Sequence, residues 1–397
     1  MQDRSSIEFK TIRIIPLIIL FFATLISNLA GQHWSASVST QVGHGDNLFE
    51  SNLVGEQFVT DGRVNLAYYP ADNLRVTGAF ARSEVLTDGL YSYSWWSGGI
   101  QWRKLDNDRH HFYSGLSYTG RRYSDYYSYY DHGDLGAYFE WKYSPLAQRS
   151  LKLGYDLQAR SFPEEAQASN TVHRGYALLT QSFNSGTALR LGGNLSYQDF
   201  WSPPLMAGRG RGFVGIPLYE ELPSNIMIDG SFRVSQSLHS RVGLALQTDW
   251  QRRLNRDASG ANYLDGLDNP FVDRFRWDGY GGSAQLTVIL PWQITAATSA
   301  DYRIRDYIDV PVYLYDFGLN EYVLDEDSYV ISHQRRRERR FDYQIRLSRS
   351  WYLPISNKFD TLGSSLTFGW NRNRSNDPLY DSSGGFITVG LQINMDK

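Results

Sequence analysis

The sequence predicts an all-β protein, a transmembrane antiparallel up-and-down β-barrel of about sixteen strands. Three observations support this fold class. Apolar and polar residues alternate with a period of two, the alternating runs are long for soluble strands, and short turns alternate with long loops between them. The composition agrees, because the chain is rich in aromatic residues and glycine and has a mean hydropathy of −0.43, which does not fit a helical membrane protein.

The composition also excludes several classes of function. The chain has 39 Lys and Arg against 42 Asp and Glu in 397 residues, so it is not a grossly basic nucleic-acid-binding protein. It has no Cys, which excludes disulfides, zinc sites with thiolate ligands and cysteine nucleophiles. The sequence also has no phosphate-binding loop, zinc-ligand spacing or dinucleotide-binding fingerprint. We therefore expect no cofactor, no metal and no nucleic-acid partner.

The amino terminus has the three-part pattern of a secretory signal peptide. Basic residues precede the apolar run 14–26, and small and polar residues follow it. The run is shorter than the roughly 20 residues that a membrane-spanning helix needs, so an uncleaved anchor is the weaker alternative. We predict that residues 1–31 are a signal peptide cleaved near Ala30 or Gly31, and that residues 32–397 form the barrel.

The alternating runs begin directly after this segment. In the run 34–42, apolar residues alternate with polar ones, and comparable runs occupy 151–157, 242–250 and 362–370. Each run, with its flanks, lasts roughly 10 to 14 residues, which matches the length of a tilted membrane strand. The alternative, a large soluble β-sandwich or propeller, would have shorter strands and, in a propeller, a repeat of blade length.

The connections between the runs alternate in length. Short turn compositions occur at 70–73, 106–109, 145–149, 184–187, 237–240, 291–293 and 354–360. Longer connections, many of them rich in Tyr and Asp, occur at 44–57, 86–90, 123–131, 163–170, 202–223, 254–274, 308–337 and 375–385. This alternation predicts short periplasmic turns, long extracellular loops, both termini in the periplasm, and a location in the bacterial outer membrane.

The carboxy terminus resembles the signal by which barrel assembly machinery recognises outer-membrane proteins. Thr388, Gly390, Ile393 and Met395 occupy its polar, glycine and apolar positions, although Met395 replaces the usual aromatic residue. The segment 370–380 is similar to the last hairpin loop of barrels linked to tetratricopeptide repeats, which export polysaccharide or assemble surface lipoproteins. These resemblances imply a porin-like barrel of the Gram-negative outer membrane, with the assembly machinery as a partner.

A barrel of this size encloses a water-filled lumen unless it is plugged. If the apolar parity of each strand faces lipid, the opposite parity lines the lumen, and its arginines outnumber its acids. The candidate pore-lining residues are Arg63, Arg75, Arg103, Arg190, Arg233, Arg303, Arg305, Arg340, Arg346, Asp301 and Asp342. One interpretation is a channel that favours anions. The alternative is that facing Arg and Asp residues pair across strands and fill the lumen.

Aromatic residues share the lumen parity. Tyr69, Trp95 and Tyr138 either stack on sugars or belong to the aromatic girdle at the rim of the barrel. The longest connection, 308–337, either folds inward as a constriction or stands outward.

The densest charge run in the chain lies at the predicted outer rim. Within 333–340, Arg335, Arg336, Arg337 and Arg339 are candidates for contact with lipopolysaccharide. Guanidinium groups bind phosphate through pairs of hydrogen bonds, so this chemistry suits a phosphorylated glycolipid. A solvated strand end is the alternative.

Two other motifs have simpler explanations. The segment 265–273 offers several oxygen ligands but lacks the twelve-residue pattern of a calcium loop, so we expect a turn there and no metal. His132 stands beside Asp131 and Asp134 at the predicted rim, where a turn explains the same residues without catalysis. We therefore expect no catalytic residues and no enzyme activity.

Together these features predict an outer-membrane pore that passes small hydrophilic solutes, anions included, by diffusion. The alternatives are the barrel component of a polysaccharide or lipoprotein export or surface-assembly system, and a structural or receptor barrel. The expected partners are outer-membrane lipid and lipopolysaccharide, the barrel assembly machinery, and either further copies in a homotrimer or a periplasmic protein.

Overall fold

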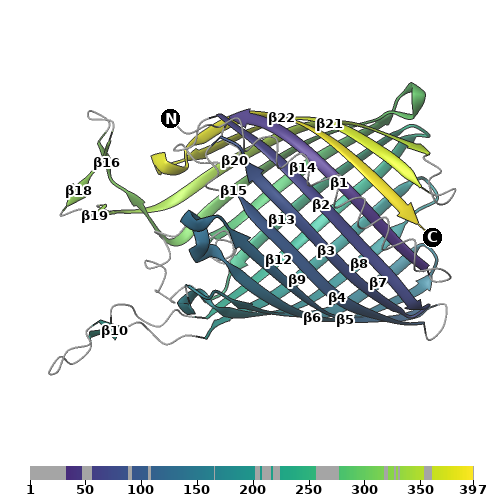
Figure 1. Cartoon of the computed structure of the whole chain (residues 1–397), viewed down its shortest axis with the longest axis horizontal. Coiled ribbons are helices and arrows are strands. Elements are labelled where there is room, and N and C mark those ends of the chain that lie inside the picture. Colours follow the sequence, from purple (N-terminus) through teal and green to yellow (C-terminus); the bar gives the residue numbers. More distant parts are fainter. Residues whose placement is uncertain are drawn as a thin grey trace, which may run out of the picture.

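The computed structural model describes residues 33–46, 56–87, 92–105, 109–164, 166–201, 206–207, 216–217, 224–255, 277–316, 321–325, 328–329, 331–352 and 360–396. Within these ranges, sixteen long strands form one closed antiparallel barrel (Figure 1). The predicted fold class and the predicted strand number are therefore confirmed. The predicted signal peptide, residues 1–31, and its cleavage near Ala30 lie outside the described residues.

The barrel strands follow the order of the chain, and each one pairs with the next. They are β1 (His33–Asp46), β2 (Glu56–Ala71), β3 (Leu74–Val85), β4 (Tyr93–Leu105), β5 (His110–Tyr123), β6 (His132–Leu146), β7 (Arg149–Ser161), β8 (Asn170–Ser182), β9 (Thr187–Phe200), β12 (Asn225–His239), β13 (Val242–Arg253), β14 (Trp277–Ile289), β15 (Thr295–Tyr313), β20 (Ile331–Tyr352), β21 (Thr361–Ser375) and β22 (Ser382–Asp396). Shorter strands pair in the long connections: β10 (Met206–Ala207) with β11 (Ile216–Pro217), β16 (Tyr315–Asp316) with β17 (Glu321–Tyr322), and β18 (Leu324–Asp325) with β19 (Ser328–Tyr329).

The strand ends that the short turns join lie at one rim of the barrel, which we call the turn rim, and the strand ends that the long connections join lie at the opposite loop rim (Figure 1). In the turn between β14 and β15, Trp292 and Gln293 both have a φ of 59°. Two successive left-handed residues match the right-handed twist of a tight hairpin. Gly186, with a φ of 77°, has a left-handed conformation in the turn between β8 and β9, where glycine adopts it without strain.

The connection 308–337 differs from the prediction. β15 continues to Tyr313 and β20 begins at Ile331, so the ladder between them extends past the rim of the neighbouring strands. Valine, isoleucine and tyrosine residues in these extensions favour strand conformation, which explains the longer hairpin. The short strands β16, β18 and β19 lie beyond the loop rim, away from the barrel wall (Figure 1).

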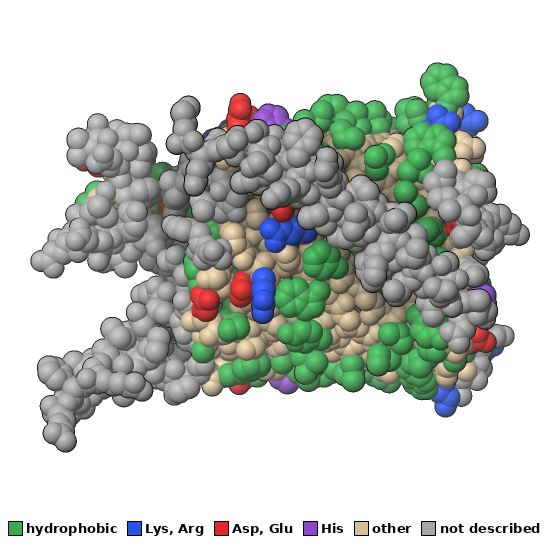
Figure 2. Space-filling model, viewed as in Figure 1, with side chains coloured by type: hydrophobic (Ala, Val, Ile, Leu, Met, Phe, Trp, Pro, Cys, Tyr) green, Lys and Arg blue, Asp and Glu red, His purple; other side chains and the backbone are tan. Residues whose placement is uncertain are grey.

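The two faces of the barrel wall differ in chemistry. Large apolar side chains such as Ile100 and Leu116 are exposed, Leu116 by 62%, and the two residues are direct partners across β4 and β5. Directly opposed residues on neighbouring strands point to the same face of the sheet. The exposed apolar residues of successive strands therefore form one continuous outer face. Figure 2 shows apolar side chains across the visible outer surface, with charged side chains mainly toward its ends. None of the described helical segments is long and apolar enough to cross a membrane.

The barrel closes between its first and last strands. β1 pairs with β22 in a continuous antiparallel register from Ser35 opposite Asp396 to Gly45 opposite Phe386. Trp34 and Ala36 form a small apolar cluster there, against which Met395 packs.

The four residues of the predicted assembly signal all lie in β22, on two faces of the strand. Ile393 lies opposite Val38 and shares the outward face with Met395, and Thr388 and Gly390 face inward.

Candidate functional site

The candidate site is the inward face of the barrel wall. All of the predicted pore-lining residues lie on the parity opposite to the exposed apolar residues. The register joins them from strand to strand, since Arg303 is the direct partner of Arg340 and Asp301 is the direct partner of Asp342. Their side chains therefore project toward the axis of the barrel. The arginines among them fall into two groups, those with a carboxylate partner and those without one among the described residues.

The first group consists of arginines that form ion pairs within the wall. The contacts are Arg340 Nε with Asp342 Oδ2 at 2.6 Å, Arg303 Nε with Asp249 Oδ2 at 3.7 Å, Arg303 Nη2 with Asp301 Oδ1 at 3.9 Å, and Arg305 Nη1 with Glu338 Oε2 at 3.8 Å. These pairs match the alternative interpretation, in which opposite charges on the wall compensate each other.

The second group consists of arginines without a carboxylate within ion-pair distance among the described residues. Its members are Arg63, Arg75, Arg103, Arg190, Arg233 and Arg346. Arg63 Nε donates to Asn65 Oδ1 at 2.8 Å, and Arg103 Nη2 donates to the carbonyl oxygen of Asp72 at 3.1 Å. Neutral acceptors satisfy the hydrogen bonds of these guanidinium groups but leave their charge uncompensated.

Two predicted aromatic residues of the wall lie beneath these cations. The guanidinium carbon of Arg63 is 5.1 Å from the centre of the Trp95 ring, and that of Arg75 is 5.7 Å from the centre of the Tyr69 ring. These cation–π contacts hold the arginines against the wall. The rings of Trp95 and Tyr69 therefore contact arginine side chains of the wall, a role that the sequence did not suggest.

Arg190 and Arg233 are direct partners across β9 and β12. Arg233 Nε donates to Ser235 Oγ at 3.3 Å, and neither guanidinium has a carboxylate partner in the described ranges. Like charges placed directly opposite each other destabilise a sheet, so this pair costs folding free energy. Two such cations side by side also raise the local positive potential on this part of the wall.

Three of the uncompensated arginines lie near the turn rim, whereas Arg63 and Arg233 lie near the middle of their strands. Arg75 is the second residue of β3, Arg103 is the third from the end of β4, and Arg190 is the fourth of β9. Wall carboxylates such as Asp134, the third residue of β6, and Asp249, near the end of β13, lie toward the loop rim instead. The wall is therefore positive near the turns and more nearly balanced near the loops.

The structure adds ion pairs that the sequence did not indicate. Arg160 Nε contacts Asp134 Oδ1 at 2.6 Å, and Arg174 on β8 pairs with Asp156 on β7. Arg174 was missed because the segment around β8 alternates poorly. Its parity, opposite to that of the apolar Leu179, is the signal that assigns it to the wall.

His132 lies at the loop rim in a structural contact. Its side chain is 3% exposed, its Nδ1 is 2.8 Å from the carbonyl oxygen of Tyr130, and its Nε2 is 3.9 Å from Asp134 Oδ2. The ring also packs against Phe162, with 5.4 Å between ring centres. Asp134 also forms an ion pair with Arg160. The contacts of His132 are therefore those of a packed structural residue, and they do not resemble a catalytic base beside a nucleophile.

The rim arginines divide between the two faces of β20. Arg335, Arg337 and Arg339 are exposed, whereas Arg336 is only 7% exposed. Arg336 Nε is 3.3 Å from Glu338 Oε1, and its guanidinium lies over the rings of two tyrosines. This corrects the expectation for Arg336, because successive residues of a strand point to opposite faces.

No group of three or more potential metal ligands occurs within the ranges that the structure describes. The segment 265–273, considered above as a calcium loop, lies outside the described residues.

No family model and no curated protein matches this sequence, but solved structures share its fold. OccAB1 from Acinetobacter baumannii has a TM-score of 0.50 and 9% identity, over 93% of this chain and 97% of that one. The chain has the fold of an outer-membrane porin. Two further similar structures are OccD3 (OpdP) from Pseudomonas aeruginosa, with 10% identity, a TM-score of 0.47 and 91% of each chain covered, and a bacterial polysaccharide outer membrane secretin, with 12% identity, a TM-score of 0.46 and coverages of 91% and 97%.

Proposed function

We propose that the protein is an outer-membrane pore through which small hydrophilic solutes diffuse, with a preference for anions. The observation that carries this proposal is the group of wall arginines, such as Arg190 and Arg233, that have no carboxylate partner among the described residues. Rings of uncompensated arginine concentrate anions and repel cations. The outward apolar face supports a membrane location, to which the signal peptide at 1–31 would direct the chain.

The test is single-channel recording of the refolded mature chain in a planar bilayer under a salt gradient. The variant Arg63→Gln, Arg75→Gln, Arg190→Gln, Arg233→Gln removes four uncompensated cations and breaks no ion pair of the described wall. We expect the ratio of anion to cation permeability to fall by at least about twofold. Arg349→Gln is the matched control, because this arginine is on the outward face over Trp351.

Ionic strength provides a second comparison. At about 0.1 M salt the screening length is about 10 Å, so the arginine charge reaches into the lumen, whereas at 1 M it is about 3 Å. The difference between wild type and the quadruple variant is therefore expected to shrink at high salt. An unchanged reversal potential at low salt would contradict anion preference. Persistent closure of a correctly folded barrel would contradict the pore itself and favour an export, receptor or structural role.

A further inference from the structure

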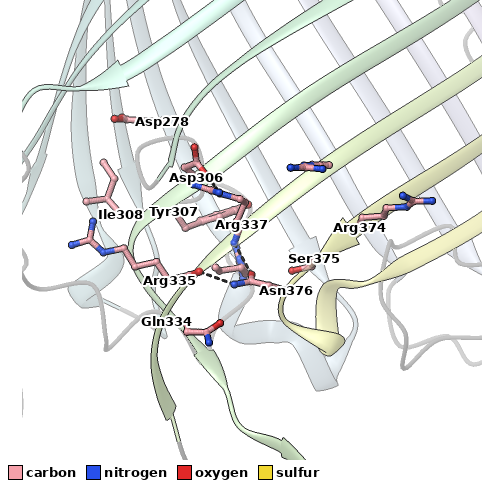
Figure 3. Close-up of a pocket in the computed structure, with 12 residues that line it drawn as sticks. Asp278, Asp306, Tyr307, Ile308, Gln334, Arg335, Arg337, Arg374, Ser375 and Asn376 are labelled. Atoms are coloured by element: carbon pink, nitrogen blue, oxygen red, sulfur yellow. Dashed lines mark hydrogen bonds and ion pairs between the residues drawn. The ribbon is translucent and has the colours of Figure 1, made fainter. Parts of the chain in front are cut away.

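A recess of about 970 Å³ lies at the loop rim, lined by residues of β14, β15, β20 and β21 (Figure 3). Its charged side chains are mostly arginines, among them Arg335, Arg337 and Arg339 from β20 and Arg374 from β21. Arg374 was not among the predicted rim residues. It comes from the neighbouring strand, and only the register reveals that it joins the others.

The register places these arginines on the outward face of the wall. Arg339 is the direct partner of both Ile304 and Arg374, and Phe341, two residues along β20 on the same face, is 37% exposed. Arg337 forms an ion pair with Asp306 of β15. Arg339 and Arg374 have no carboxylate within ion-pair distance in the described part of the chain. Two directly opposed arginines repel each other unless an anion lies between them.

Aromatic residues fix the level of this pair relative to the membrane. Tyr343 is opposite Trp370 on the same outward face, and Phe341 packs against Trp370 with 5.8 Å between ring centres. Rings of this kind mark the boundary between hydrocarbon and head groups in outer-membrane barrels. Arg339 and Arg374 lie beyond these rings toward the loop rim. They are therefore at the level of the head groups of the outer leaflet.

The backbone beneath the arginines is held in place by Asn376. Its Oδ1 accepts from the backbone N of Arg337 at 2.7 Å, and its Nδ2 donates to the carbonyl oxygen of Arg335 at 2.9 Å. The side chain thus continues the hydrogen-bond ladder between β20 and β21 past the end of β21, as Figure 3 shows. The arginines therefore project from a fixed strand pair and not from a free loop.

We propose that this recess binds a phosphate group of the glycolipid in the outer leaflet, with Arg339 and Arg374 as its ligands. The two guanidinium groups offer paired donors to the phosphate oxygens, and the bound anion removes the repulsion between them. Arg337, whose charge is compensated by Asp306, lies beside them in the same recess. The site faces the membrane and not the lumen, so it is independent of the proposed transport function.

The experiment measures binding of lipid A to the folded mature barrel in detergent by native mass spectrometry. The probes are lipid A with both phosphates, the same lipid after removal of both phosphates, and inorganic phosphate. We expect the variant Arg339→Gln, Arg374→Gln to bind the phosphorylated lipid at least about tenfold more weakly. Arg349→Gln, an outward arginine near the turn rim, is the control and is expected to bind as wild type does.

Equal binding by the double variant and wild type would overturn the proposal, as would equal binding of the two lipids. Displacement of the lipid by an equal concentration of inorganic phosphate would show a site for free phosphate instead. The single variants Arg339→Gln and Arg374→Gln, each expected to lose part of the affinity, keep the test valid if the double variant folds poorly. The reversal potential of the double variant is expected to match wild type, so failure of this proposal and failure of the pore are distinguishable.

Discussion

At the scale of single residues, one glycine of the wall makes room for an aromatic side chain. Gly154 on β7 lies beneath the ring of Tyr176, and a Cβ atom at Gly154 would be 2.1 Å from the Cζ atom of that ring. Tyr176 donates from its hydroxyl to Glu140 Oε2 at 2.9 Å, and Lys152 Nζ contacts the other carboxylate oxygen, also at 2.9 Å. The missing side chain thus allows the ring to reach this ion pair.

We therefore expect Gly154→Ala to displace the Tyr176 ring and break its hydrogen bond to Glu140. Overpacking of this kind lowers the free energy of unfolding by about 1–3 kcal/mol. Denaturant titration of the barrel in lipid vesicles measures the change. Gly243→Ala is the control, because nothing lies within 4 Å of a Cβ atom at Gly243. Equal stability of the two variants would show that the ring adjusts without loss.

At the scale of elements, each strand separates its residues between lipid and lumen by their parity. In β22, Leu391 is 50% exposed on the outward face between Thr40 and Ser364. The next residue, Gln392, projects inward and donates from Nε2 to Asn394 Oδ1 at 2.7 Å. Leu391 therefore faces the lipid, and its neighbour Gln392 faces the lumen.

This difference predicts opposite tolerance to charge at adjacent positions. Leu391→Arg is expected to destabilise the barrel by about 2–4 kcal/mol if the side chain reaches the middle of the bilayer, because the cation leaves water. Gln392→Arg is expected to change stability little, since its side chain enters the lumen. Titration of both variants in the same vesicles compares them directly. Equal losses would contradict the assignment of the two faces.

The parity of the strands was predictable from the sequence because alternation is a property of each strand alone. It placed Arg63 and Arg75 on the inward face before any partner was known. The partners were not predictable, since they depend on the register between strands. Arg303 reaches Asp249 on β13, two strands from its own, and Arg374 meets Arg339 through a pairing that no local pattern reveals. Rim sites and ion pairs therefore required the structure, whereas the fold did not.

At the scale of the whole molecule, the charge of the wall changes along the barrel axis. Uncompensated arginines such as Arg75, Arg103 and Arg190 lie near the turn rim, and carboxylates such as Asp134 and Asp249 lie toward the loop rim. A lumen with one positive end presents ions with different fields from its two sides.

The asymmetry predicts that the open channel rectifies. Currents of equal and opposite voltage through a single oriented channel are expected to differ at low salt, and the difference is expected to decrease in Arg75→Gln, Arg190→Gln, Arg346→Gln. Current–voltage curves at about 0.1 M and 1 M salt give the measurement, because screening removes the effect at high salt. Arg349→Gln, on the outward face, serves as the control. Symmetric currents in the wild-type protein would contradict the prediction.

The seam between β1 and β22 has a consequence for the time order of folding. Ser35 and Asp396 are partners although nearly all of the described chain lies between them. The sheet therefore has two open edges until the last strand pairs with the first, and closure is the least local step of folding. Open edges invite pairing with other chains. A chain whose last strand has not yet paired with the first therefore exposes both edges to aggregation, although the closed barrel exposes neither.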